Sequence, residues 1–145
     1  MDDTLVALQD RIRRLEDMDE IRSLYVDYGR NLDAEDPAGY ASLFARDAKL
    51  RLGRVMRADG REAIERAAAS VIRSGPNGER QSVHVLGAPH VELDGDTATG
   101  EAVWVAILRA EGGPPTVRVG RHVDKLVREE GRWRFAERRG FQDIG

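Results

Sequence analysis

Apolar side chains in residues 4–32 recur every three or four positions, which is the spacing of one face of an α-helix. They form two sets, Leu5, Leu8, Ile12, Leu15 and Met18, and then Ile21, Leu24, Tyr25 and Tyr28. The first set is heptad-like and predicts a helix that projects and packs on a partner subunit. The second predicts a helix that lies on the core and ends near residues 29–31. Asp17 or Asp19 is a candidate N-cap for a restart between them.

The next segment predicts two further helices and a hairpin. Asp36 has the place of an N-cap and Pro37 that of the first residue in a short helix. Paired strands are predicted at residues 48–52 and 55–58, and a loop at residues 74–78. The helix before that loop has an apolar face made of Ile64, Ala67, Ala68, Val71 and Ile72.

The second half has the pattern of long strands joined by tight turns. The predicted strands are residues 81–93, 97–109, 116–128 and 132–141. Gly87-Ala88-Pro89 interrupts the first of them and predicts a β-bulge. Strands joined by hairpins form an antiparallel meander, and helices that precede such strands are typical of the α+β class. Because long strands curl, helices packed on their concave face should enclose a cone-shaped pocket within a single domain of residues 1–145.

Composition limits the partners of such a domain. The 145 residues carry 23 basic and 26 acidic side chains, a formal charge of −3, which predicts no general attraction to nucleic acid or to anionic membranes. The chain lacks cysteine, a recognisable signal peptide and any apolar run of the ~20 residues that would span a bilayer. A cytoplasmic protein is expected.

The three histidines differ in their predicted orientation. With a bulge after Leu86, the side chain of His84 faces inward on the first long strand, while His90 faces outward. His122 lies in the middle of a later strand. A lone histidine is often structural, and we interpret His90 in that way, whereas His84 and His122 are candidates for chemistry.

Asp33 and Tyr28 are candidates from the core helix. Asp33 follows its apolar face, and Asp36 already serves as the cap of the next helix. The carboxylate of Asp33 should therefore point across the mouth of the sheet, although a turn-capping role stays open. Tyr28 lies five residues earlier and either lines the same cavity or is an ordinary core aromatic.

Several segments together resemble the SnoaL-like family of the nuclear transport factor 2-like superfamily. The similar segments are residues 21–33, 43–48, 82–84, 91–98, 120–126 and 131–139. The resemblance covers nearly the whole chain. It implies a cone-shaped, curved antiparallel sheet with three amino-terminal helices on its concave face, the cystatin-like α+β barrel. The fold hosts dehydratases, isomerases, cyclases, hydrolases and non-catalytic subunits, so it implies much less about function.

Two groups of dehydratases in this superfamily suggest site residues. The bile-acid 7α-dehydratases are similar in placing a tyrosine, an aspartate and a histidine where Tyr28, Asp33 and His84 stand. Their further carboxylate corresponds to Ala106, so their chemistry is not copied directly. The scytalone dehydratases are similar in pairing an aspartate at the Asp33 place with a histidine on the strand of His122. Their water-holding tyrosines correspond to Leu32 and a residue near Leu52, so the pocket must differ.

We therefore expect Asp33 and His122 to form a general acid–base dyad, with His84 or the hydroxyl of Tyr28 polarising a substrate carbonyl. This is lyase or isomerase chemistry without a cofactor or metal. Expected substrate-binding residues are Tyr25, Leu32, Leu86, Trp104 and Ala106. Apolar residues on the strands, Val83, Val85 and Val103 among them, favour a small apolar carbonyl compound such as a polyketide, a steroid or an aromatic.

Three alternatives stay open at this point. The chain could be a non-catalytic module that binds a small molecule or associates with another subunit. Two histidines and a carboxylate also match the ligand set of non-haem iron enzymes. Arg121 and Asp124 are compatible with the epoxide-hydrolase chemistry that occurs in this fold. The side chain of Arg121, however, should point to the opposite face of the strand from that of His122. A homodimer or homotrimer is expected in each case.

Overall fold

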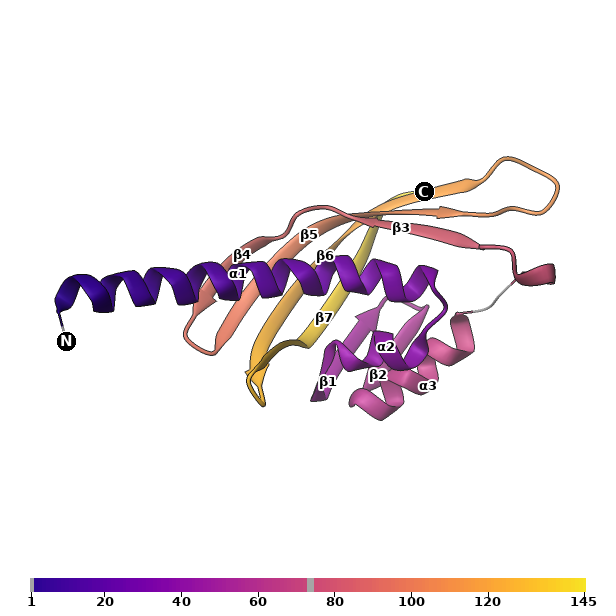
Figure 1. Cartoon of the computed structure of the whole chain (residues 1–145). Coiled ribbons are helices and arrows are strands. Elements are labelled where there is room, and N and C mark those ends of the chain that lie inside the picture. Colours follow the sequence, from indigo (N-terminus) through magenta and orange to yellow (C-terminus); the bar gives the residue numbers. More distant parts are fainter. Residues whose placement is uncertain (1, 73–74) are drawn as a thin grey trace.

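A computed structural model of the chain describes residues 2–72 and 75–145 (Figure 1). Ser74, the first residue of the loop predicted at residues 74–78, lies outside the described residues. The elements in chain order are α1 (Asp3–Asp33), α2 (Pro37–Ser42), β1 (Phe44–Leu52), β2 (Met56–Asp59), α3 (Arg61–Val71), the 3₁₀ turn η1 (Pro76–Gly78), β3 (Ser82–Leu86), β4 (His90–Asp94), β5 (Thr97–Leu108), β6 (Thr116–Glu129) and β7 (Arg132–Ile144). Helices therefore precede most of the strands, as the α+β pattern predicts.

The strands form one curved sheet in the described part of the chain. The order of pairing is β2-β1-β7-β6-β5-β3, and β4 also pairs with β5, beyond the end of β3. All neighbours are antiparallel except β1 and β7, which run parallel and join the first strand to the last. The predicted meander of four strands is confirmed: its first strand is present as β3 and β4, which both pair antiparallel with β5, and β6 and β7 follow. The sequence did not reveal the parallel pair.

The strand predicted at residues 81–93 is divided in two. Residues 87–89 leave the ladder between β3 and β4, yet the Gly87 N–H still donates to the Val103 carbonyl at 2.7 Å. Leu86 before the interruption and Val91 and Leu93 after it all pack against the core. Strict alternation would put Leu86 on the opposite face from the other two, so the interruption changes which side chains face inward. The predicted bulge and its effect on register are confirmed.

Helix α1 is continuous from Asp3 to Asp33, so the predicted restart at Asp17 or Asp19 is wrong. Asp17 is buried and binds the sheet instead. Its Oδ1 accepts hydrogen bonds from Nη2 of Arg128 at 2.7 Å and from Nε1 of Trp133 at 3.0 Å. Asp2 is the N-cap of the helix, and its carboxylate accepts a hydrogen bond from the Thr4 N–H. Asp17 thus joins the middle of α1 to β6 and β7.

The helices pack on the curved sheet and enclose an aromatic core. Figure 1 shows α1 lying across the sheet, with α2 and α3 beside β1 and β2. Asp36 caps α2 and Pro37 is its first residue, as predicted. The largest fully buried side chains are Trp133, Arg138, Tyr25, Tyr40, Phe44, Phe135, Ile21, Leu50, Ile64 and Leu126. Among the described residues, no helix has the length and hydropathy needed to cross a membrane.

Candidate functional site

Asp33 and His84 form a close pair between the end of α1 and strand β3 at the edge of the sheet. Oδ1 of Asp33 lies 2.8 Å from Nδ1 of the His84 ring. The two carboxylate oxygens of Asp33 also lie 3.1 and 3.0 Å from the backbone N–H of His84, which donates to them. One carboxylate therefore fixes both the backbone and the ring of the same histidine.

This arrangement determines how the His84 ring presents itself. A carboxylate accepts hydrogen bonds, so Nδ1 carries the proton and Nε2 keeps the lone pair in the neutral ring. Side-chain exposure is 23% for His84 and 12% for Asp33, so the pair is partly reached by solvent. The result is an oriented imidazole that has a negative charge behind it and a basic nitrogen on its other side.

Gly29 permits this close approach of helix and strand. A Cβ at position 29 would lie 3.0 Å from the His84 carbonyl oxygen and 3.2 Å from a methyl group of Leu86. Gly29 is buried one turn before Asp33. The absence of a side chain at Gly29 therefore lets α1 lie against β3 closely enough for the carboxylate to reach the histidine.

His122 lies deeper, on β6, and is 5% exposed. Its ring centroid is 5.3 Å from that of Tyr28 and 5.9 Å from that of Trp104. Its Nδ1 has no hydrogen-bond partner among the described residues. Burial, followed by the positive charge of Arg138 and the influence of His84, holds the pKa of His122 well below 6.5. His122 is therefore neutral at neutral pH.

The expected pairing of Asp33 with His122 is wrong, because Asp33 binds His84 instead. The order of residues along the chain could not decide between the two histidines. Both alternate inward, and the choice depends on which strand α1 crosses at its end. The contact of α1 with β3 puts His84 there.

A buried ion pair that the sequence did not reveal lies beneath His122. Arg138 on β7 donates from Nε and Nη2 to the two oxygens of Asp124 on β6, at 2.8 and 2.7 Å. The hydroxyl of Tyr25 donates to the same carboxylate at 2.5 Å. The side chains of both charged residues are fully buried. Alternation predicts that Asp124 faces inward with His122, but a register shift on β7 hid the position of Arg138.

Tyr28 belongs to this cluster. The guanidinium of Arg138 lies 4.2 Å from the centre of its ring, and its hydroxyl is 3.0 Å from that of Tyr40. Burial raises the pKa of Tyr28, so its hydroxyl keeps its proton. Nη1 of Arg138 has no hydrogen-bond partner among the described residues. Tyr28 therefore lies between the buried cation of Arg138 and the neutral ring of His122, and its hydroxyl is protonated.

Of the predicted substrate-binding residues, two lie next to the histidines and three belong to the core. Trp104 is half-buried beside His122, and its indole Nε1 lacks a partner within the described chain. Ala106 is buried on β5 and lies directly opposite His84 on the adjacent strand β3. Leu32 and Leu86 pack on the core, whereas Tyr25 is occupied by Asp124.

Two valines expected in the cavity, Val85 and Val103, are exposed. They alternate with the inward-facing side chains of β3 and β5, so they lie on the convex face of the sheet. The expectation that they line the pocket is wrong.

The other sequence candidates lie outside this cluster. His90 is exposed and 3.7 Å from Glu92, so the outward orientation predicted for it is confirmed. Arg121 lies over the ring of Phe141 and near Asp143, away from Asp124, which opposes the epoxide-hydrolase alternative. Within residues 2–72 and 75–145, no three histidine, aspartate or glutamate side chains gather closely enough to hold a metal ion.

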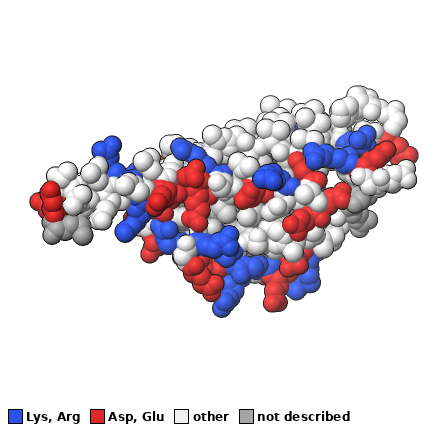
Figure 2. Space-filling model, in the orientation of Figure 1, with Lys and Arg blue, Asp and Glu red and all other residues white. Residues whose placement is uncertain are grey.

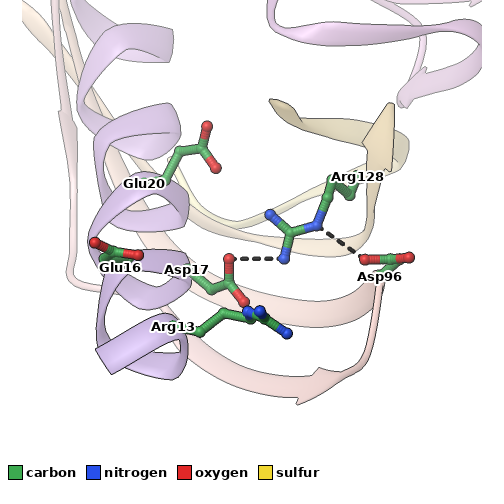
Figure 3. A pocket seen from close by; sticks show the side chains of 6 residues that line it. All are labelled: Arg13, Glu16, Asp17, Glu20, Asp96 and Arg128. Atoms are coloured by element: carbon green, nitrogen blue, oxygen red, sulfur yellow. Dashed lines mark hydrogen bonds and ion pairs between the residues drawn. The ribbon is translucent and has the colours of Figure 1, made fainter. Parts of the chain in front are cut away.

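Two surface grooves lie away from the Asp33–His84 pair. A groove of about 600 Å³, shown in Figure 3, is lined by Arg13, Glu16, Asp17, Glu20, Asp96 and Arg128. Arg128 crosses it and binds both Asp17 and Asp96. A second groove, of about 310 Å³, lies at the other end of the sheet, by Ser82 and Arg109. Figure 2 shows acidic and basic side chains interspersed over one face, without a large area of one sign.

Solved structures with the same architecture include three informative ones. A nuclear transport factor 2-like protein with a cystatin-like fold, from Novosphingobium aromaticivorans, is 29% identical, with a TM-score of 0.80 over 97% of this chain and 90% of that one. A protein from the same organism, provisionally named scytalone dehydratase, is 23% identical (TM-score 0.77; 90% and 87% covered). A hexachlorocyclohexane dehydrochlorinase, LinA type 2, is 19% identical (TM-score 0.80; 92% and 90% covered).

The sequence itself decides the family. No curated protein matches it significantly. The family model described as the SnoaL-like domain, however, matches residues 13–139, which include every candidate site residue discussed above. The helices of this chain, packed on a curved sheet, agree with the cystatin-like fold of the similar structure from Novosphingobium aromaticivorans. The chain therefore belongs to the SnoaL-like domain family of the nuclear transport factor 2-like superfamily.

Proposed function

We propose that the chain is a cofactor-independent lyase or isomerase of the dehydratase type, with His84 as its general base and Asp33 as the residue that orients it. The observation that carries this proposal is the double hold of Asp33 on His84, through Nδ1 and through the backbone N–H. Such a carboxylate stabilises the imidazolium that forms when the other ring nitrogen takes a proton.

In the proposed reaction, Nε2 of His84 removes a proton from the carbon next to a substrate carbonyl. The electron pair of the broken C–H bond forms a carbon–carbon double bond, and negative charge develops on the carbonyl oxygen as an enolate. When the enolate collapses, a hydroxide leaves from the next carbon and takes the proton from the His84 imidazolium as water. In an isomerase, the same proton would return to a different carbon.

Tyr28 and His122 are suited to stabilise the enolate oxygen. Burial keeps the hydroxyl of Tyr28 protonated, and the low pKa of His122 keeps its ring neutral, so each can donate a hydrogen bond. The buried cation of Arg138 lies beside both and adds a favourable field. The two histidines thus exchange the roles expected from sequence, because among the described residues Asp33 binds the ring of His84.

The proposed substrate is a small apolar carbonyl compound, such as a polyketide, a steroid or an aromatic. Trp104 offers apolar surface beside His122, and Leu86 lies two residues after His84 on β3. Two of the similar structures, those called dehydratase and dehydrochlorinase, bear names that denote elimination of a small molecule from a carbon skeleton. An elimination that begins with loss of a carbon-bound proton matches the paired residues of this chain.

The test measures proton abstraction separately from loss of the leaving group. A panel of β-hydroxy ketones is incubated with the protein in D₂O, and exchange at the carbon next to the carbonyl is followed by NMR. Substituting Asp33→Asn or His84→Gln should lower the exchange rate by about 10²–10⁴-fold. His90→Gln is the matched control, because His90 is an exposed histidine on the neighbouring strand, and it should keep the wild-type rate.

Exchange that is equally fast in His84→Gln and wild type would reject His84 as the base. The second candidate function is non-catalytic binding of a small molecule. It is favoured by the aromatic rings that fill the centre of the fold and by the two described grooves, which other residues line. Saturable binding of an apolar ketone, without exchange and unaffected by His84→Gln, would support this second function.

A further inference from the structure

The first half of α1 carries an apolar stripe that its own chain leaves uncovered. Leu5, Leu8, Ile12 and Leu15 are between 45% and 69% exposed. Figure 1 shows the beginning of this helix extending past the sheet towards the N-terminus. Four large apolar side chains aligned on a projecting helix are uncommon on the surface of a monomer, and they mark a contact site.

The stripe faces away from the chain's own sheet. An α-helix turns by about 100° per residue, so two positions nine residues apart lie on opposite faces. Ile12 and Ile21 are nine apart, and so are Leu15 and Leu24. Ile21 and Leu24 are buried against the core. No part of the same sheet can therefore cover the stripe, and its partner must approach from the opposite side of α1.

We propose that the stripe binds the same stripe of a second copy of the chain, as a short parallel coiled coil. The spacing of 3, 4 and 3 residues assigns Leu5 and Ile12 to the a positions, and Leu8 and Leu15 to the d positions, of two heptads. Asp19 would occupy the next a position, where like charges would face each other, so the contact ends before it.

Charge complementarity selects the parallel arrangement. In this register Arg11 is a g position and Glu16 the e position five residues later, so a parallel pair brings each Arg11 towards Glu16 of the second copy. An antiparallel pair would instead bring the two copies of Arg11 together. The sheets do not obstruct the parallel pair, because each sheet lies on the outer side of its own helix.

The chain contains no cysteine, which permits a direct test of register by cross-linking. In a parallel coiled coil, residue 8 of one copy faces residue 8 of the other, whereas in an antiparallel pair it faces residue 12. Oxidised Leu8→Cys should therefore form a disulfide-linked dimer. Val6→Cys is the matched control, since Val6 is an exposed apolar residue on a different face of α1, and it should stay mainly unlinked. Equal cross-linking of the two variants would overturn the proposal.

Light scattering after gel filtration supplies an independent readout. Leu8→Glu combined with Ile12→Glu should halve the molar mass relative to wild type, and Val6→Glu should leave it unchanged. Arg11→Glu and Glu16→Arg should each weaken association, and together they should restore it. A wild type already as small as the Leu8→Glu, Ile12→Glu variant, or no rescue by the double charge reversal, would overturn the proposal. These outcomes do not depend on the proposed catalysis.

Discussion

At the scale of single residues, the buried charges are the most sensitive part of the molecule. Arg138 and Asp124 are inaccessible to water and are joined by two hydrogen bonds. The pair itself adds little net stability, because both ions lose their hydration when they are buried. Removing one member is different, since it leaves the other ion buried without a partner.

Arg138→Met should therefore lower the free energy of unfolding by about 3–5 kcal/mol. Urea denaturation followed by circular dichroism measures this change. Glu137→Gln is a suitable comparison on the same strand, because Glu137 pairs with the exposed Arg139 and should cost less than about 1 kcal/mol. Equal losses in the two variants would contradict the assigned difference between buried and exposed pairs.

At the scale of elements, the packing of α1 on β3 depends on Gly29. In an exposed helix interior, glycine to alanine stabilises by up to about 1 kcal/mol. Here the new methyl group would lie 3.0 Å from the His84 carbonyl oxygen, so helix and strand must separate.

Gly29→Ala should therefore fail to stabilise the protein and should loosen the contact between Asp33 and His84. NMR of the His84 ring protons reports the contact, and urea denaturation reports the stability. Ser23→Ala, on the exposed side of the same helix, is the comparison and should be neutral or slightly stabilising. A gain in stability for Gly29→Ala with an unchanged His84 signal would contradict this account.

Helices and strands were predictable from sequence where a single periodicity of apolar residues governs them. They were less predictable where a tertiary contact determines their bounds or pairing. The spacing of Leu5 to Leu15 and of Ile21 to Tyr28 correctly indicates helix. The apolar side chains change face between the two sets, however, and this change was interpreted as the end of one helix and the start of another. Turn residues located the hairpins of β5, β6 and β7.

The site was predictable as a set of residues and not as a set of contacts. Asp33, His84, His122 and Tyr28 all lie at or near the concave face of the sheet, as alternation and helix periodicity indicate. The pairing of Asp33 with His84 depends on the crossing of α1 over β3, which no local pattern encodes. Arg138 was missed because a register shift displaces the alternation of β7.

At the scale of the whole molecule, stability should depend on pH through His122. Its pKa is lowered in the folded protein, whereas the unfolded chain has the ordinary value near 6.5. The unfolded state therefore binds more protons once the pH falls below about 6.5, and stability declines by up to about 1.4 kcal/mol per pH unit. Lowered carboxylate pKa values, such as those of Asp17 and Glu129, act only at lower pH, beneath about 5.

His122→Gln should remove most of the decline between pH 6.5 and about 5. Urea denaturation at a series of pH values measures it, and His90→Gln is the control, because that histidine is exposed on β4. A slope that is the same in wild type and in His122→Gln over this interval would show that another group takes up the proton.

The parallel pair of β1 and β7 has a consequence for how the chain reaches this state. Leu50 pairs with Arg138, roughly ninety residues later, so β1 can join the main sheet only after β7, the last strand of this domain, has been synthesised. Until then, β1 has only the short β2 beside it, and Asp124 lacks its cation. On the ribosome, the helices and the first hairpin should therefore stay loosely associated, and the ion pair should lose its water in the final step of folding.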